Sequence, residues 1–287
     1  FDLNNNIKVS SLYAKKISFK RSLPSTILKI RNFVKKQNID TLVVVDSISC
    51  IFTIPALYGL KVNHICWEHF NFNVDLGVKY RRIGRKWAAR YCDYIVTLTS
   101  RDKELWEKGL RKIQAKIVPI LNPSPYEKID NKPSLDYKTV LSIGRLTPQK
   151  GFDLLIAAWA ELGEDIGDWN LKIVGDGEDE AKLKDLAKFK GVSNSVHFIP
   201  STKDVEHYYK TSSFYCLSSR YEGLPMVLLE AQAFGLPIVA FNCDTGPSEV
   251  ITDAVNGYIC KPNNIENLAE SLRKMILSEP ENYSQMF

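Results

Sequence analysis

The chain has 287 residues, 45% of them hydrophobic, and a formal net charge of +5. This length favours two domains over one. No run of about 18 uncharged apolar residues occurs, which argues against a membrane-spanning helix in this stretch, and no secretory signal is visible.

The ends of the chain and its cysteines indicate whether residues are missing and which redox compartment the protein occupies. Because the sequence starts on Phe1 and stops just after a helical segment, we expect residues beyond both ends. The cysteines are scattered and form no Cys-x-x-Cys pair, which favours buried free thiols in a reducing compartment over disulfides or a zinc site. They are Cys50, Cys66, Cys92, Cys216, Cys243 and Cys260.

Charge differs between the two halves. Residues 1–130 carry 23 Lys and Arg against 11 Asp and Glu, a net charge of +12, and residues 131–287 carry 15 against 22, a net charge of −7. The first half is therefore expected to face something anionic, with nucleic acid and an acidic membrane surface as the two candidates.

Short β-branched runs recur along the chain, and each is followed by an amphipathic segment of helical length. Continuous apolar strands that alternate with helices predict parallel sheets covered on both faces, so the fold class is α/β. The expected strands are 41–46, 64–69, 94–99, 116–121, 139–144, 171–176, 195–200, 214–219 and 237–242.

A proline-rich stretch interrupts this pattern where the charge changes sign. Residues 122–138, NPSPYEKIDNKPSLDYK, contain three prolines and no periodicity. We expect domains at 1–123 and 139–287 joined by a linker over 124–138. Two doubly wound domains would bind ligands in the cleft at the carboxyl ends of their strands.

Two acids lie in RYEGLPMVLLEAQAFGLP, residues 220–237. Pro225 suits the first turn of a helix that ends near Gly235, so Glu222 lies in the preceding loop and Glu230 lies inside the helix. The helix N-terminus is an anion site. A carboxylate in partly apolar surroundings needs hydrogen-bond donors, and a ribose or sugar diol supplies two.

A second cluster comes from SIGRLTPQKGFDLLIAAW, residues 142–159. Arg145 and Lys150 follow a strand, and two cations there can neutralise a diphosphate without metal. Solvated loop charges would give the same pattern. KIVGDGEDEAKL follows, with Gly175 and Gly177 in a tight turn.

The order Gly-Arg-Leu-x-x-x-Lys-Gly, Val-Gly-Asp-Gly and Glu-x7-Glu with an internal Gly-Leu-Pro resembles the retaining glycosyltransferases of family 4, which have the two-domain GT-B fold. The resemblance is densest over 139–262 and looser over 41–123. It implies that Arg145 and Lys150 hold the donor's diphosphate, that Glu230 binds the ribose, and that Glu222 contacts the donor sugar. Further donor-binding residues implied by the resemblance are Gly144, Gly223, Leu224, Pro225, Met226 and Val227, with Phe198 and Ile199 lining the base.

On the acceptor side, WEHFN closes a strand and places His69 at its carboxyl end. A structural histidine would fit the same pattern. Similar enzymes have a histidine here beside the reacting carbon of the sugar, so the resemblance implies that His69 positions or polarises the reacting groups. The leaving diphosphate would take the acceptor's proton in a front-face reaction.

The segment KYRRIGRKWAARY, residues 79–91, has basic residues at helical spacing beside aromatic ones. This pattern is typical of a membrane-surface helix, although a helix that packs Ile83 and Trp87 into its own core would also produce it. The basic run 13–21 supports the membrane interpretation. The expected membrane-surface residues are Arg82, Arg85, Lys86 and Trp87.

These patterns favour a metal-independent, retaining glycosyltransferase without a cofactor, which moves a hexose or N-acetylhexosamine from a nucleotide sugar, UDP-linked in our expectation. The expected acceptor is a lipid-diphosphate-linked saccharide of surface polysaccharide assembly, at the cytoplasmic face of the membrane. A nucleotide-sugar 2-epimerase of the same fold is the alternative enzyme. A nucleic-acid binder is a third reading, but no recognisable motif supports it and the acidic half would be repelled.

Overall fold

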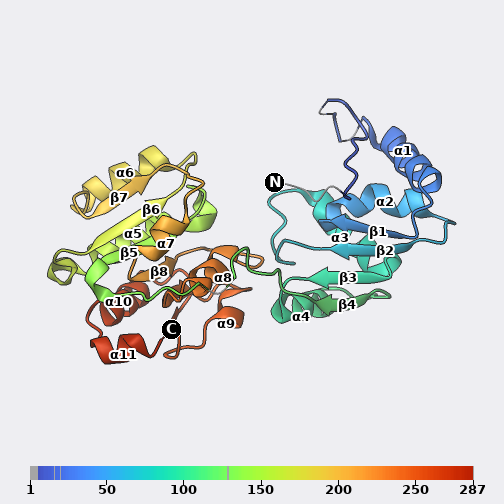
Figure 1. The fold of residues 1–287 in the computed structure, drawn as a ribbon. Helices are drawn as coiled ribbons and strands as arrows, with labels where there is room; N and C mark the ends of the chain where they lie inside the picture. Colours follow the sequence, from blue (N-terminus) through green and yellow to red (C-terminus); the bar gives the residue numbers. More distant parts are fainter. Residues whose placement is uncertain (1–5, 16, 20, 128, 287) are drawn as a thin grey trace. The chain divides into compact units, whose positions relative to one another are not determined.

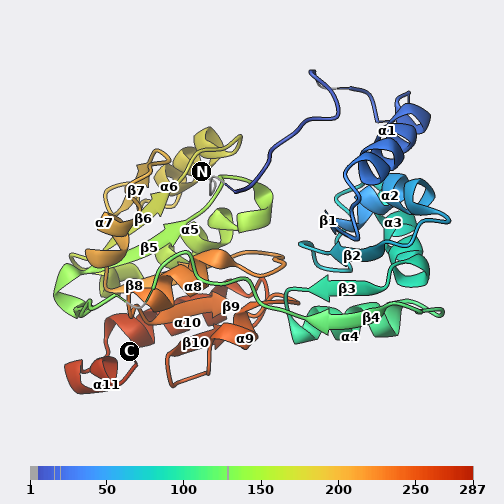
Figure 2. The ribbon, with the colours of Figure 1, turned by 45° about the vertical axis from the view of Figure 1, so that its right-hand side comes forward.

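The computed structural model describes residues 6–15, 17–19, 21–127 and 129–286. The chain forms two compact units, unit 1 up to Ile120 and unit 2 from Leu121 onward. Each unit is an α/β structure built on its own parallel sheet (Figures 1 and 2).

Unit 1 contains a four-stranded parallel sheet in the order β1-β2-β3-β4. Helices α2, α3 and α4 pack on one face of this sheet, the face that carries Val44, Cys66, Ile95 and Ile117 in one cross-strand row. On the other face of β1, Val43 and Val45 are exposed. Its elements are α1 (Leu23–Lys36), β1 (Thr41–Val45), η1 (Ser47–Ser49), α2 (Cys50–Leu57), β2 (Asn63–Trp67), α3 (Lys79–Tyr91), β3 (Tyr94–Thr97), α4 (Ser100–Gly109) and β4 (Lys116–Pro119).

The core of unit 1 joins the sheet to its helices. Strand β2 alternates, so that His64 and Cys66 are buried on one face while their neighbours are more exposed. Ile95 of β3 and Trp106 of α4 are fully buried. These residues anchor the sheet whose carboxyl edge carries the polar residues described below.

Unit 2 contains a six-stranded parallel sheet in the order β10-β9-β8-β5-β6-β7. Its strands are β5 (Thr139–Ile143), β6 (Asn170–Val174), β7 (Val196–Ile199), β8 (Phe214–Leu217), β9 (Ile238–Phe241) and β10 (Gly257–Cys260). Its helices are η2 (Leu135–Tyr137), η3 (Pro148–Lys150), α5 (Phe152–Ala160), η4 (Gly163–Ile166), α6 (Glu180–Phe189), α7 (Glu206–Lys210), α8 (Met226–Ala233), α9 (Pro247–Val250), α10 (Ile265–Ile276) and α11 (Pro280–Ser284).

The α/β class and every strand expected from the sequence are confirmed, within one or two residues at each end. Strand β10 was not predicted, because it has only four residues and begins at Gly257, which forms a turn signal together with Asn256. The segment expected as a linker belongs to unit 2. There the Ile129 amide donates to the Ala233 carbonyl and the Tyr126 ring packs edge-on against Phe234, so the segment is attached to the end of α8.

Among the described residues, no helix is both long and apolar enough to cross a bilayer.

Candidate active site in the second unit and a polar edge in the first

The strand order of unit 2 reverses between β5 and β8. Strands β6 and β7 follow on one side of this pair, and β9 and β10 follow on the other. Ligands of open parallel sheets bind beyond the carboxyl ends of the strands at such a switch point. Lys150 lies in the loop after β5 and Glu222 lies in the loop after β8, so both expected site residues lie at this position.

Lys150 and Glu222 form a direct ion pair. Lys150 Nζ donates to Glu222 Oε1 over 2.7 Å, and Ser219 Oγ donates to the same oxygen over 2.6 Å. The side chain of Glu222 is 7% exposed and that of Lys150 is 20% exposed. The pair therefore holds a cation at the switch point with its ammonium partly open to a ligand.

Several contacts fasten the loop after β8 to the loop after β5. Ser218 Oγ donates to the Lys150 carbonyl, and the Arg220 guanidinium donates to both carboxylate oxygens of Asp153. Gly151 has φ +64°, and a side chain there would overlap the Ser218 carbonyl. This close packing fixes the geometry of the Lys150–Glu222 pair.

Arg145 lies at the same edge but is not held in the same way. Its side chain is 76% exposed, and its nearest acidic partner is Glu178 at 3.7 Å. It borders a cavity of about 330 Å³ at the carboxyl ends of β5, β6 and β7. The lining residues are Ile143, Gly144, Arg145, Val174, Gly175, Asp176, Ser201, Thr202 and Val205.

This cavity brings Gly144 and Arg145 together with residues that the sequence analysis missed. The Ser201 hydroxyl donates to the Asp176 carboxylate inside it. Phe198 and Ile199 do not line it, because the Phe198 ring packs against the core and Ile199 lies on β7, where its carbonyl accepts from the Gly175 amide. Asp176 is the last residue of the expected strand 171–176, and Ser201 and Thr202 directly follow the expected strand 195–200, so the polar residues at these strand ends would have identified them.

Helix α8 begins at Met226 after Pro225, and carries Glu230 in its second turn. Leu224 and Pro225 are buried, whereas Gly223, Met226 and Val227 are half-buried. Glu230 is half-buried, and its Oε2 accepts from the Tyr209 hydroxyl over 2.8 Å.

The Tyr209 hydroxyl explains how Glu230 is held on an apolar helix. The Tyr209 ring is fully buried and stacks on Phe234 at a centroid distance of 5.1 Å. Burial, together with the nearby charge of Glu230, raises the pKa of Tyr209, so this phenol stays protonated and donates. In the part of the chain that the structure describes, Oε1 of Glu230 has no hydrogen-bond partner and remains available.

In unit 1 the carboxyl ends of β1 and β2 carry Asp46, Ser47, Glu68 and His69. His69 is half-buried, and its ring lies 5.1 Å from that of Trp67. Burial lowers the pKa of His69 while the charge of Asp46 partly opposes this, so the imidazole is neutral near pH 7. Glu68, next to it, is 1% exposed and accepts from Ser47 Oγ over 2.5 Å.

Arg85 is not a surface residue, which corrects its expected membrane role. It is 2% exposed, and its Nε lies 3.6 Å from Glu68 Oε2. Its guanidinium also donates to three carbonyl oxygens of the loop that follows His69, those of Asn71, Phe72 and Val74. Arg85 therefore faces inward and holds this loop.

Arg81 is buried as well, but the other four basic residues of α3 form an exposed stripe. Lys79, Arg82, Lys86 and Arg90 are exposed, whereas Trp87 is half-buried. Two adjoining cavities of about 320 and 490 Å³ lie along α3 and share Lys86, Gly109 and Leu110 as lining residues. We call this the basic groove, and its cations are Arg82, Lys86, Arg90, Arg111 and Lys112.

The sequence analysis missed Arg111 and Lys112 because they follow a different helix, α4. Within the expected basic run 13–21, Lys16 and Lys20 lie outside the described residues.

The chain is similar to known proteins over most of its length. The family model described as glycosyl transferases group 1 matches residues 125–286. An uncharacterized glycosyltransferase of Haemophilus influenzae is 42% identical, over 100% of this chain and 80% of the relative. An α-1,4-N-acetyl-D-galactosaminyltransferase of Campylobacter jejuni is 27% identical, over 97% of this chain and 78% of the relative. Its name includes a saccharide acceptor on diNAcBac-PP-undecaprenol.

Among solved structures, the apo form of the lipopolysaccharide outer core galactosyltransferase WaaB superposes with a TM-score of 0.72 at 25% identity. The superposition covers 90% of this chain and 71% of that structure.

Proposed function

Since the chain belongs to the group 1 glycosyl transferases and has the GT-B fold, we propose that it is a retaining enzyme of family 4 that transfers a sugar from a UDP-linked donor. The proposed acceptor is a saccharide on a lipid diphosphate, in the assembly of a surface polysaccharide. The name of the Campylobacter jejuni relative supports the lipid-diphosphate acceptor, and the name of WaaB supports a role in the assembly of a surface polysaccharide.

The observation that carries the proposal is the Lys150–Glu222 pair at the switch point of unit 2. A cation preplaced there stabilises the negative charge that develops on a departing nucleoside diphosphate, and Arg145 supplies a second cation at the cavity rim. Glu222, held by Lys150 and Ser219, contacts the donor sugar, and Glu230 accepts from the ribose.

Unit 1 serves the acceptor. The neutral His69 imidazole polarises or positions the reacting groups, and the proton of the attacking hydroxyl passes to the leaving diphosphate in a front-face reaction. Glu68 and Arg85 hold the loop beside His69, so they act as positioning residues.

A panel of nucleotide sugars tests the donor assignment. The purified protein is incubated with UDP-, GDP- and TDP-linked hexoses and N-acetylhexosamines, with and without a polyprenyl-diphosphate saccharide, and release of the nucleoside diphosphate is measured. We expect turnover with a UDP sugar, stimulated by the acceptor, and a product that keeps the donor's anomeric configuration. A product with the inverted anomeric configuration would contradict the retaining mechanism, and a preference for a GDP sugar would contradict the UDP-linked donor.

We expect transfer to proceed without a divalent ion, because Arg145 and Lys150 balance the diphosphate. Brief incubation with EDTA should leave the initial rate within about twofold of the untreated enzyme. If EDTA abolishes transfer and only Mg²⁺ or Mn²⁺ restores it, a metal neutralises the diphosphate and this expectation is wrong.

Glu230→Ala should weaken binding of free UDP by about 1.5 to 3 kcal/mol, the range for a hydrogen bond to a charged group. Isothermal calorimetry measures this loss. Glu206→Ala, which removes an exposed acid paired with Lys210, is the control and should bind UDP like the wild type. If the Glu230 variant and this control bind UDP with equal affinity, Glu230 does not bind the ribose.

The basic groove should attach unit 1 to an anionic leaflet, because each Lys or Arg near such a surface contributes about 1 kcal/mol. We expect the variant Arg82→Ser, Lys86→Ser, Arg90→Ser to co-sediment less with vesicles containing phosphatidylglycerol, and wild-type binding to fall steeply as salt rises.

The matched control for this experiment is Lys188→Ser, Lys190→Ser, Lys203→Ser, which removes the same charge from exposed positions of unit 2. It should bind like the wild type. Equal binding by all three proteins, or no binding at low salt, would show that the groove does not serve the membrane.

A further inference from the structure

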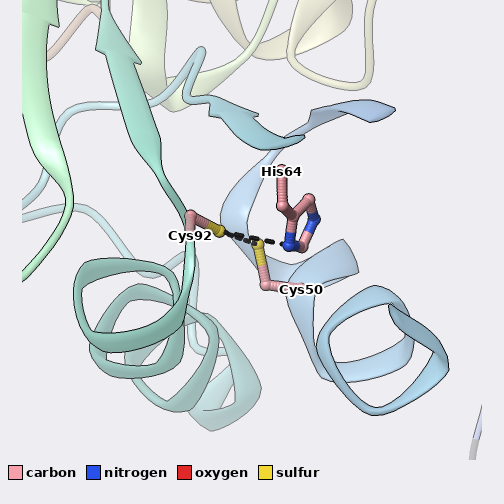
Figure 3. A group of neighbouring side chains, drawn as sticks. All are labelled: Cys50, His64 and Cys92. Atoms are coloured by element: carbon pink, nitrogen blue, oxygen red, sulfur yellow. Dashed lines mark hydrogen bonds between the residues drawn. The ribbon is translucent and has the colours of Figure 1, made fainter. Parts of the chain in front are cut away.

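Three potential metal ligands meet in the core of unit 1, away from the residues assigned above. Cys50 is the first residue of α2, His64 lies on β2, and Cys92 follows α3 (Figure 3). Their exposed fractions are 0%, 3% and 5%. The three ligand atoms all lie within 4.8 Å of one another, although the residues come from three separate elements.

Two of the three distances between the ligand atoms match those of a tetrahedral zinc site. Zinc binds thiolate sulfur at about 2.3 Å and imidazole nitrogen at about 2.0 to 2.1 Å, which places two sulfurs about 3.8 Å apart and a sulfur and a nitrogen about 3.6 Å apart. Cys50 Sγ and Cys92 Sγ are 3.9 Å apart, and Cys92 Sγ and His64 Nδ1 are 3.5 Å apart. Both edges agree within the tolerance expected of a real site.

Cys66 is the candidate for a fourth ligand. It lies two residues after His64 on β2, so the alternation of the strand puts both side chains on the same face of the sheet. It is fully buried, but its sulfur does not belong to the group of atoms that lie within 4.8 Å of one another, so its side chain would have to move to complete a tetrahedral set. Three sulfurs and one imidazole nitrogen are a common ligand set for structural zinc.

The surroundings favour a centre with little net charge. Cys50, Cys66 and Cys92 belong to the apolar core cluster of unit 1, together with Ala88 and Ile95. The thiolates of Cys50 and Cys92 balance the charge of Zn²⁺, and a third thiolate from Cys66 would give the centre a net charge of −1. Without an ion, the only hydrogen-bond partner of the buried His64 ring among the described residues is the thiol of Cys92. A thiol forms weak hydrogen bonds, so it offsets little of the free-energy cost of burying an imidazole.

We propose that Cys50, His64 and Cys92, completed by Cys66, bind a structural zinc ion in unit 1. The ion joins the start of α2, strand β2 and the end of α3, and so stabilises the unit that carries His69. The site takes no part in donor chemistry, and its ligands are too buried for brief EDTA treatment to remove the ion.

Metal content and a spectrum test this proposal on the full-length chain. Protein expressed with added zinc should carry about one zinc per chain by mass spectrometry of the metal. Protein expressed with Co²⁺ instead should show thiolate-to-cobalt charge-transfer absorption and the strong visible bands of tetrahedral cobalt. Both readouts use the unmutated protein and do not depend on sugar transfer.

Variants assign the ligands. Cys50→Ser and Cys92→Ser should lose the metal and lower the midpoint of thermal unfolding, whereas Cys216→Ser and Cys260→Ser, which alter buried thiols of unit 2, should keep the metal. Wild-type protein that holds no zinc and no cobalt overturns the proposal. A Cys50–Cys92 disulfide found by peptide mass spectrometry without reduction also overturns it.

Discussion

Lys150→Ala is expected to lower kcat/KM for sugar transfer by about 10²- to 10³-fold, the loss that follows removal of one preorganised group that stabilises transition-state charge. The ammonium of Lys150 is held by the Glu222 carboxylate at the switch point of unit 2, where the diphosphate departs in our proposal. Steady-state kinetics with a UDP sugar measures the effect. Lys188→Ala, an exposed lysine of the same unit, is the control and should match the wild type.

The pairing of Lys150 with Glu222 adds a second expectation to this experiment. Because Lys150 Nζ and Glu222 Oε1 are in contact, the effects of Lys150→Ala and Glu222→Gln on kcat/KM should be strongly non-additive in a double-mutant cycle. Glu222→Gln alone should reduce transfer while leaving UDP affinity nearly unchanged. A Lys150 variant that keeps more than about a third of the wild-type rate would refute its role at the diphosphate.

Arg85→Met is expected to destabilise unit 1 by about 3 to 5 kcal/mol, the cost of breaking a buried ion pair by removing one partner. It would leave the Glu68 carboxylate uncompensated at 0% side-chain exposure and would free the three carbonyls of the loop after His69. Urea unfolding, with hydrogen exchange read on peptides of unit 1, measures the loss.

The control for Arg85 is Arg82→Met, three residues earlier on α3. The Arg82 side chain is 77% exposed and faces Asp75 at 3.3 Å, so its removal should cost less than about 1 kcal/mol. The double variant Arg85→Met, Glu68→Leu should recover part of the stability, because it removes both charges. Equal losses for the Arg85 and Arg82 variants would contradict the buried role of Arg85.

The sequence predicted the strands of both units well, because most of them are short apolar runs bounded by polar or turn-forming residues. It also predicted that Glu222 would lie in a loop and Glu230 within a helix, since Gly223 and Pro225 mark the boundary between them. It could not predict their partners. Ser219 is near in sequence to Glu222, but Lys150 and Tyr209 meet the two acids only through the order of strands in the sheet.

The error at Arg85 has a physical reason that the sequence partly contained. Basic residues at helical spacing were assigned to the surface, yet Arg81 and Arg85 share a face with Gly84, Ala88 and Ala89. A side chain at Gly84 would overlap the Ser47 carbonyl, so the small residues mark the side that packs closely. The prediction placed Arg85 on the surface because of its charge and did not use the small residues beside it. The acids that pair with the two inward-facing arginines, Glu68 and Asp46, lie outside α3.

The attachment of Lys150 to Glu222 has a consequence for when conformational entropy is lost. A free lysine side chain has roughly 2 kcal/mol of rotamer entropy, which a ligand that immobilises it must overcome at every binding event. Here the carboxylate of Glu222, itself fixed by Ser219, already restricts that side chain in the unliganded protein. The rotamer entropy of Lys150 is therefore lost when unit 2 folds, and each incoming diphosphate binds a cation that is already immobilised.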